Sequence, residues 1–386
     1  MSGQVETLDY GRYVVSPERG FLPDAEPLAS VGAGVHPALR RLDELGDELP
    51  ATLERDRLRS AVRNLEAPPP AALDDLSRRE LHRIYTVSGF PANAYANGPD
   101  APPVDAIPAG VAVPLYEATD RLDRTPVLSY DAYVLHNWTR DDPEGGTNPR
   151  NVRPLTRFLD VRDERWFVAI HVAIESAAAP AVAAIGDAQQ GVRDDDEERV
   201  REALVTMADA LADVTRILDR MPERNDPEVY GTGFRPYLGS LSDVEYEGVD
   251  ALDGPQSFRG ASGAQSSCFP ALDAALGVDH GDNPLVAHLR ELRRDMPPAH
   301  RAFVEAAEDG PSVHDYVETA DAALRGAYNE CIDRMVTFRE HHVDVVHTYL
   351  VGELDDREGT GGTPFGRYLS TFVEDTRDAR LPATAG

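Results

Sequence analysis

The segment most informative about this chain spans residues 339–350 and reads REHHVDVVHTYL. At helical spacing, His342 shares one face with apolar side chains before and after it, namely Met335, Phe338, Val345, Val346 and Tyr349. His341 instead shares a face with polar side chains, namely Arg334, Thr337, Asp344 and Thr348. The segment therefore predicts a long helix that points His342 into the protein and His341 towards water.

An inward histidine such as His342 has two interpretations. It is either a core residue bonded to a backbone carbonyl, or a ligand of a metal ion or of haem. His347 lies five residues further on and points roughly 140° away from His342, so the two do not share one ion within the helix. If His342 binds iron, it binds it alone on this helix, and that suits haem better than zinc.

The composition indicates a folded protein with a strongly acidic surface. A chain of 386 residues with 41% hydrophobic residues buries a substantial core, as two domains or one large one. Lysine is absent, so all 38 basic residues are arginine, and 68 acidic residues bring the net charge to −30. This pattern is typical of a protein kept soluble in strong salt, and it disfavours nucleic acid and anionic membranes as partners.

The sequence predicts neither a disulfide framework nor a secretory signal. Cys268 and Cys331 form no C-x-x-C motif, and the N-terminal residues MSGQVE lack a basic region followed by an apolar run. Residues 166–185 are as long as a membrane-spanning helix but contain Glu175, which favours a buried core helix. We therefore expect a cytoplasmic protein.

The spacing of apolar residues predicts a mainly α-helical protein. In the N-terminal part, prolines and glycines predict short helices, with one ending before Pro50, a loop over 89–110, and a short strand or loop over 111–115. From about residue 155 the periodicities become long. Acidic residues 194–198 predict a helix start, and a last helix is predicted over about 313–351. We expect a small N-terminal helical domain, residues 1–150, and a large all-helical domain, residues 151–386.

Four segments differ from ordinary helix surface. Arg235 lies among apolar residues in FRPYL, residues 234–238, and needs an anionic partner, which is either an internal carboxylate or a ligand. His171 lies inside an apolar run and is either structural or placed opposite His342 around one cofactor. Residues 260–267, GASGAQSS, permit close backbone approach, and residues 359–363, GTGGT, form a substrate loop or a linker.

In order and spacing, these segments resemble the indoleamine 2,3-dioxygenase family. Arg235, Ser262 and His342 are followed by the 359–363 loop, as in that family. Residues 293–301, RRDMPPAHR, resemble the family's RR-x-MPPAHR stretch, and upstream Tyr130 also fits. The resemblance covers about residues 110–370, and the combination of motifs is highly specific.

The resemblance implies a haem protein with haem b between a small and a large helical domain. By position, His342 resembles the proximal iron ligand. Arg339, one turn earlier, resembles an arginine that reaches a haem propionate and pairs with an aspartate, here Asp273. Ser262 resembles a residue of the turn above the haem.

The resemblance also implies how the substrate is held. Arg235 resembles the arginine that binds the carboxylate of the amino acid, and Thr360 resembles the loop residue near its ammonium group. The other implied pocket positions are Tyr130, Phe167 and Tyr230, which are aromatic, and the turn of Ser262, Gly263 and Ala264. His171 departs from animal members, which have serine there; by analogy with tryptophan 2,3-dioxygenases it bonds the indole N–H or the oxygen.

We therefore expect a haem-dependent dioxygenase that cleaves the indole C2–C3 bond of L-tryptophan with O2 and yields N-formylkynurenine, the first step of the kynurenine pathway. Arg235, Thr360 and His171 are the expected catalytic residues, and an electron donor keeps the iron reduced. Two alternatives are a family member that oxidises a tryptophan-like indole to another product, and a catalytically idle haem- or tryptophan-binding protein.

Overall fold

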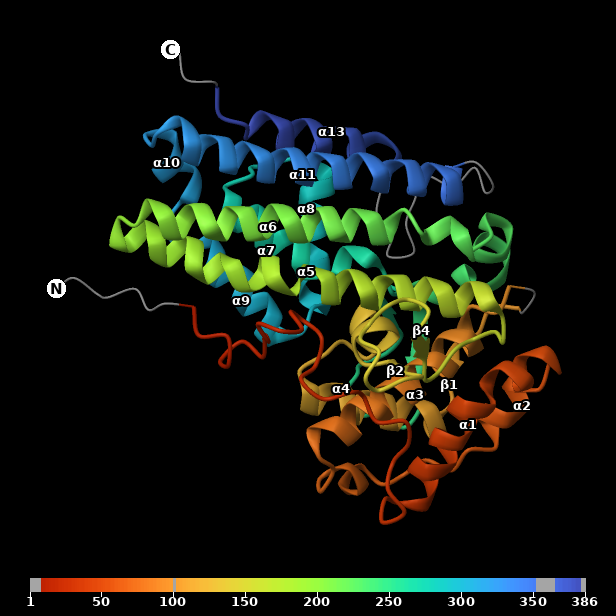
Figure 1. Ribbon diagram of the computed structural model, residues 1–386. Helices are drawn as coiled ribbons and strands as arrows, with labels where there is room; N and C mark the ends of the chain where they lie inside the picture. Colours follow the sequence, from red (N-terminus) through yellow and green to blue (C-terminus); the bar gives the residue numbers. More distant parts are fainter. Residues whose placement is uncertain (1–7, 100–101, 352–364, 383–386) are drawn as a thin grey trace.

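The computed structural model describes residues 8–99, 102–351 and 365–382, and this part of the chain is mainly α-helical, as predicted (Figure 1). Its longer helices in the first half are α1 (Pro37–Glu54), α2 (Leu58–Arg63), α3 (Arg78–Ala96), α4 (Ala109–Leu122), α5 (Arg162–Asp194) and α6 (Glu197–Leu218). The later helices are α7 (Cys268–Leu276), α8 (Pro284–Leu292), α9 (Pro298–Glu308), α10 (Val313–Glu318), α11 (Ala322–Val346) and α13 (Phe365–Asp378).

The long helices form successive layers over one side of the molecule. Helix α6 packs against both α5 and α11, and α11 packs in turn against α13, while α1 to α4 gather on the far side of α5 (Figure 1). Acidic N-caps start two of these helices, because the side chain of Asp196 accepts a hydrogen bond at the start of α6 and that of Asp321 at the start of α11. The predicted helix start at the acidic run 194–198 is therefore confirmed.

Short strands connect the two groups of helices. β1 (Ala106–Ile107) runs parallel to β4 (Leu241–Tyr246), and β4 pairs antiparallel with β5 (Gln256–Phe258). β2 (Trp138–Arg140) and β3 (Val152–Pro154) form a separate antiparallel pair. The pairing of β1 with β4 brings the segment after residue 235 back onto the N-terminal helices.

The buried apolar residues form two clusters that meet along α5. One cluster contains most buried apolar residues of 22–172 together with those of 237–261, and the other contains buried apolar residues of 8–21, 166–221, 268–349 and 373–381. Val168 and Val172 of α5 belong to the first cluster, whereas Ile170 and Ile174 belong to the second, because successive positions face different sides of a helix. Phe167 packs against both clusters, so this turn of α5 lies at their junction.

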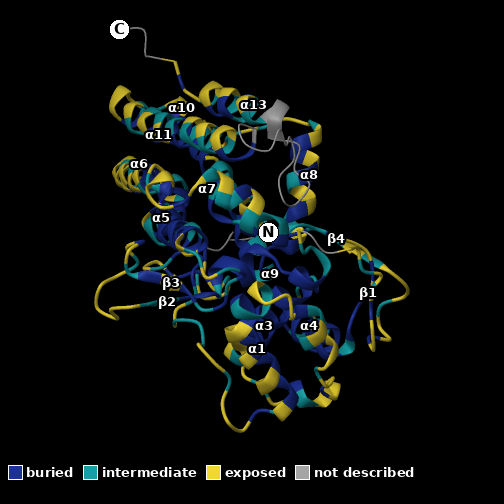
Figure 2. Cartoon of the chain, turned by 90° about the vertical axis from the view of Figure 1, so that its right-hand side faces the viewer, coloured by how far each residue is buried: buried dark blue, intermediate teal, exposed yellow. Residues whose placement is uncertain are grey.

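Most residues of helix α5 are buried (Figure 2). Among the described residues it is the one helix long and apolar enough to cross a membrane, but 72% of its most apolar window is buried inside the protein. This burial agrees with the predicted core helix. The division into domains at residue 150 stays a prediction, since the apolar clusters draw on segments from both sides of it.

Three predictions about helix ends in the N-terminal part are wrong, and all three rested on prolines and glycines. Pro50 lies inside α1, which continues to Glu54, and Pro91 lies inside α3, which runs through residue 89 to Ala96. Residues 111–115 are helical within α4, around Pro114. An interior proline loses one backbone hydrogen bond, and burial of the apolar faces of these helices outweighs that loss.

The last predicted helix is not continuous. α10 ends at Glu318, and α11 starts at Ala322 after its N-cap Asp321. Apolar periodicity continues across this break, and for this reason the sequence pattern did not reveal it. A π-helical turn over His347–Val351 then follows α11.

Candidate active site

His342 lies in the last two turns of α11, on the face that the sequence predicted. Its ring lies 6.1 Å from that of Phe338, with the two planes 11° apart. No hydrogen-bond partner faces it among the described residues, and its side chain is partly exposed. Burial, together with nearby His171 and Arg339, lowers the pKa of His342 to about 4. The imidazole is therefore neutral at physiological pH, the state in which histidine ligates metals.

The two neighbouring histidines of this segment point elsewhere. Nδ1 of His341 lies 2.6 Å from a carboxylate oxygen of Asp219 on the surface, and His347 is exposed. Helical geometry thus distinguished the three correctly, because a rotation of 100° per residue separates adjacent side chains.

Arg339, one turn before His342, is buried and held from two sides. Its Nη2 lies 2.7 Å from both carboxylate oxygens of Asp273 on α7, and Nη1 bonds the hydroxyl of Thr376 on α13. Burial raises the pKa of Asp273, but Arg339 and His280 outweigh this effect and lower it on balance. The structure thus brings Arg339 and Asp273 together as an ion pair beside His342.

His171 lies on α5 and approaches His342 from another helix, since it is one of the groups that lower the pKa of His342. Its Nδ1 lies 2.8 Å from the carbonyl oxygen of Phe167. Burial lowers the pKa of His171, so the ring is neutral, and the carbonyl acceptor requires the proton on Nδ1. Nε2 then carries a lone pair and acts as a hydrogen-bond acceptor.

Aromatic rings surround His171 on the side of residues 228–238. Phe167 lies 4.3 Å from the ring of His171 and 5.3 Å from that of Tyr230. Tyr230 in turn makes an edge contact with Tyr349 at 5.6 Å. Phe167 and Tyr230 were predicted as pocket residues, whereas Tyr349 was predicted only to lie on the apolar face of its helix. Tyr230 and Tyr349 each lie in or beside a π-helical turn, a local distortion that often occurs at functional sites.

Tyr130 is buried and belongs to a polar network that the sequence did not reveal. Its hydroxyl donates to Oε1 of Glu175 at 2.9 Å, and the hydroxyl of Ser266 donates to the same oxygen at 2.7 Å. Burial raises the pKa of Glu175 despite these two bonds, and its Oε2 has no hydrogen-bond partner within the residues that the structure describes. Glu175 stands one turn after His171 in an otherwise apolar helix, and that isolated position was the available signal.

The turn at Ser262, Gly263 and Ala264 is tied to the Tyr130 segment. Oε1 of Gln265 accepts hydrogen bonds from the backbone N–H groups of Tyr130 at 2.9 Å and Ser262 at 3.2 Å. Gly260 permits the approach, because a Cβ there would meet the Leu238 carbonyl oxygen at 1.9 Å. The close contact therefore joins this turn to the segment that follows Arg235.

Arg235 lies where the π-helical turn Val229–Phe234 passes into the 3₁₀ turn Arg235–Leu238. Its side chain is partly buried, and Phe234 before it contacts both Phe167 and Tyr230 through ring edges. The backbone of Arg235 therefore lies next to these aromatic rings. Thr360 and the rest of the 359–363 loop lie outside the described residues.

Comparison with known proteins shows the family to which this chain belongs. The family model described as indoleamine 2,3-dioxygenase matches residues 9–379. Indoleamine 2,3-dioxygenase 1 of Rattus norvegicus is 31% identical over 360 residues, which cover 86% of this chain and 87% of the rat protein. The mouse protein of the same name is 32% identical over 360 residues, with coverage of 86% and 87%. Indoleamine 2,3-dioxygenase of Saccharomyces cerevisiae is 28% identical over 368 residues, which cover 88% of this chain and 80% of the yeast protein.

The mainly helical fold and these matches define the chain as an oxidoreductase of the dioxygenase class. The chain belongs to the indoleamine 2,3-dioxygenase family. The resemblance inferred from the motifs around Arg235, Ser262 and His342 is thereby confirmed.

Proposed function

We propose that this protein is a haem-dependent dioxygenase that cleaves the indole C2–C3 bond of L-tryptophan and releases N-formylkynurenine. The observation that carries the proposal is the neutral imidazole of His342, which is partly exposed and has no hydrogen-bond partner among the described residues. It lies beside a buried arginine and near a second neutral histidine from another helix. The relatives named above are indoleamine 2,3-dioxygenases.

The residues around His342 fit haem b. In this proposal His342 supplies the single nitrogen ligand that haem iron takes from a protein. Arg339 supplies a cation for a propionate, and Asp273 holds the guanidinium in position with two hydrogen bonds of 2.7 Å. Ser262 would contribute to the haem pocket from the turn at residues 262–264. Haem, when bound in the ferrous state, supplies the redox chemistry through which O2 reacts with the indole.

Residues of both apolar clusters are proposed to bind tryptophan. Arg235 is proposed to hold the substrate carboxylate with its planar fork, and Thr360 to lie near the ammonium group. Phe167, Tyr130 and Tyr230 surround the indole, with the turn of Ser262, Gly263 and Ala264 closing one side of the pocket. Such positioning holds the reacting carbons in a fixed place and excludes water.

His171 is proposed to accept a hydrogen bond from the indole N–H. Its Nδ1 proton is committed to the carbonyl oxygen of Phe167, so Nε2 offers a lone pair. Nε2 can accept a hydrogen bond from the indole N–H. It cannot bond the oxygen in the same way, because an oxygen atom would need a hydrogen-bond donor. Both atoms of O2 enter the product and no proton is lost overall, so the reaction needs no protein base.

The setting of the enzyme is also a proposal. The two unpaired cysteines support a reducing compartment such as the cytoplasm, where an electron donor keeps the iron ferrous. The net charge of −30 supports adaptation to high salt and argues against nucleic acid and anionic membranes as partners. A division at residue 150 into a small N-terminal domain and a large haem-binding domain is part of the same proposal.

The test is a product assay on purified holoprotein. The haem is reduced anaerobically, tryptophan is added, O2 is admitted, and the products are separated by chromatography and weighed by mass spectrometry. N-formylkynurenine, heavier than tryptophan by two oxygen atoms, supports the proposal. Another indole product would favour a family member with different chemistry, and unchanged tryptophan would indicate an idle binding protein. The latter two outcomes both contradict the proposal.

A further inference from the structure

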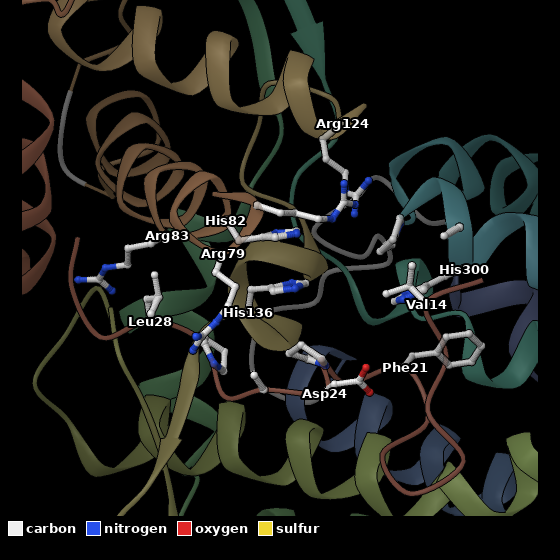
Figure 3. A pocket seen from close by; sticks show the side chains of 16 residues that line it. Val14, Phe21, Asp24, Leu28, Arg79, His82, Arg83, Arg124, His136 and His300 are labelled. Atoms are coloured by element: carbon white, nitrogen blue, oxygen red, sulfur yellow. The ribbon is translucent and has the colours of Figure 1, made fainter. Parts of the chain in front are cut away.

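A cavity of about 260 Å³ lies apart from the proposed haem and tryptophan site (Figure 3). It is bounded by the N-terminal segment around Phe21, the first turns of α3, and the start of α9 at Pro297 and His300. None of the residues proposed above to bind haem or tryptophan lines it. Its function is therefore a separate question.

The lining of this cavity is basic, in contrast to the chain as a whole. It contains four arginines and three histidines but one carboxylate, whereas the chain carries a net charge of −30. The basic lining residues are Arg78, Arg79, Arg83, Arg124, His82, His136 and His300, and the carboxylate is Asp24. In such an acidic protein, this concentration of arginine indicates an anionic ligand.

Two of the four arginines are left without a carboxylate. Arg83 is neutralised by Asp43 at 2.6 Å and Asp47 at 3.0 Å, and Arg124 pairs with Asp131 at 2.6 Å. Among the described residues, Arg78 has no hydrogen-bond or ion-pair partner for its guanidinium. Arg79 donates to the backbone carbonyl of Glu26 at 2.6 Å, which leaves its charge uncompensated.

His82 places an unused polar atom at the inner end of the cavity. The residue is 93% buried, and its Nδ1 has no hydrogen-bond partner in the described part of the chain. Its ring stacks on that of His136, with centroids 3.6 Å apart and planes 4° apart, and Figure 3 shows both rings extending into the same space. Leaving a buried polar atom unpaired costs about 1–3 kcal/mol, so a ligand that bonds it gains affinity.

A metal ion is a weaker interpretation of the same cluster. The ligand atoms of His82, Asp131 and His136 lie within 4.8 Å of one another. Both oxygens of Asp131 are already bonded, however, one to Arg124 and the other to Nδ1 of His136, each at 2.6 Å. The two imidazole planes are parallel, so their lone pairs do not converge on one point. The nearby guanidinium groups repel a cation further.

The rest of the lining is apolar and shapes the ligand. Phe21, Pro23, Leu28 and Pro297 are among the side chains that form this wall. A free inorganic ion would leave that wall in contact with water. A ligand with an apolar body and one anionic group matches both parts of the lining.

We propose that this cavity is a second binding site, for a small organic anion whose carboxylate or phosphate group contacts Arg78 and Nδ1 of His82. Its apolar body lies against the wall that includes Phe21 and Pro297. A neutral His82 in the tautomer that carries its proton on Nδ1 donates one hydrogen bond, and Arg78 at the rim donates two.

Isothermal titration calorimetry of the holoprotein at one fixed chloride concentration tests this site. The probes are phenyl phosphate, benzoate, inorganic phosphate, phenol and zinc chloride. We expect one saturable site for phenyl phosphate or benzoate, with phenyl phosphate bound about tenfold more tightly than inorganic phosphate because of its ring. Whichever of phenyl phosphate and benzoate binds more tightly shows whether the site prefers a phosphate or a carboxylate group. Phenol is expected not to bind.

Variants locate the anion. Arg78→Gln and His82→Phe are each expected to weaken binding by about tenfold, and phenylalanine keeps a ring against His136. Arg57→Gln removes the same charge from an exposed position outside the cavity and is expected to change nothing. Circular dichroism and the haem spectrum check that each variant is folded.

Three results would overturn the inference. The first is a failure of every anion to bind the wild-type protein. The second is loss of anion binding in Arg235→Ala with no effect of Arg78→Gln, which would place the anion in the proposed tryptophan pocket. The third is binding of zinc alone, abolished in His82→Phe, which would make the cluster a metal site. None of these results bears on the dioxygenase assay, so the two proposals fail independently.

Discussion

The hydroxyl of Tyr130 donates a hydrogen bond to Oε1 of Glu175 over 2.9 Å, and this bond ties the segment after α4 to the buried core of α5. Ser266 donates to the same oxygen from the 260–267 loop at 2.7 Å. Glu175 therefore joins three segments on the side of the pocket where His171 lies. Burial raises the pKa of Glu175, and its Oε2 has no hydrogen-bond partner among residues 8–99, 102–351 and 365–382, so the protonated form of the carboxyl group is favoured.

Glu175 is expected to make stability depend on pH. Burial raises its pKa, so the folded protein holds a proton that the unfolded chain loses above pH of about 4.3. The folded state binds more protons between that pH and the raised pKa, so stability falls as pH rises through this window. Glu175→Gln keeps a neutral group and removes this fall. Urea unfolding at several pH values should show that the free energy of unfolding of the variant increases relative to that of the wild type as pH rises.

If the difference in free energy of unfolding between wild type and Glu175→Gln stayed constant across pH, the carboxyl group of Glu175 would not be protonated in the folded state. Glu175→Leu serves as the companion variant, because it leaves the hydroxyls of Tyr130 and Ser266 without their acceptor. It is expected to lose about 1–3 kcal/mol of the free energy of unfolding.

Replacement of His342 with alanine is expected to abolish stable haem binding, because the iron loses its only proposed protein ligand. Haem content per chain and the Soret absorbance of the purified variant measure this effect. His341→Ala is the matched control, since His341 is the next residue and pairs with Asp219 on the surface. Wild-type haem content in the His342 variant would remove this residue from the proposal.

Arg235→Ala is expected to weaken tryptophan binding by about 100-fold while haem is retained, since it removes a charge-assisted bidentate contact. Spectral titration of the holoprotein with tryptophan gives the affinity. Tryptamine lacks the carboxylate, so its affinity should be the same in wild type and variant. An equal loss for both ligands would indicate a collapsed pocket and not a lost carboxylate contact.

His171→Ser is expected to raise KM for tryptophan about two- to tenfold, as expected for one neutral hydrogen bond. Haem content should not change. With 1-methyltryptophan as the ligand, which has no indole N–H, wild type and variant should bind equally. If the variant weakened binding of both compounds equally, His171 would act through packing against Phe167 and not through its Nε2.

Arg339→Met and Asp273→Leu are each expected to cost about 3–5 kcal/mol of unfolding free energy, because each removes one partner of a buried ion pair. The double variant should lose less free energy of unfolding than the two single variants lose together. Urea unfolding of the apoprotein measures all three. In the holoprotein, Arg339→Met is expected to release haem faster than Asp273→Leu does, and equal release rates would argue against contact of Arg339 with a propionate.

Helix identity was predictable where apolar periodicity is long, and helix ends were not. The acidic run 194–198 predicted the start of α6 correctly because capping is a local interaction. Pro50, Pro91 and Pro114 did not end their helices, because the apolar faces around them are buried by distant parts of the chain. That burial is a tertiary effect, and the sequence near each proline carries no sign of it.

Candidate site residues with a motif around them were recognisable in the sequence, and candidates without one were not. Arg235, Ser262 and His342 were recognisable because each lies in a segment with an unusual pattern. Glu175 stood alone in an apolar run and was weighed only as an obstacle to membrane insertion. The cavity beside His82 was missed as well, because its lining comes from short pieces of chain that are far apart in sequence.

The sequence by itself determined that the protein is mainly helical, that it belongs to its family, and which of three histidines in residues 339–350 points inward. Local periodicity and ordered motifs carry that information. Only the tertiary structure decided that Arg339 pairs with Asp273, that Tyr130 and Ser266 share Glu175, and that basic side chains meet beside His82. Those contacts join residues far apart in the sequence, such as Tyr130 and Ser266, which are 136 positions apart, and such separations are bridged only when the apolar clusters pack.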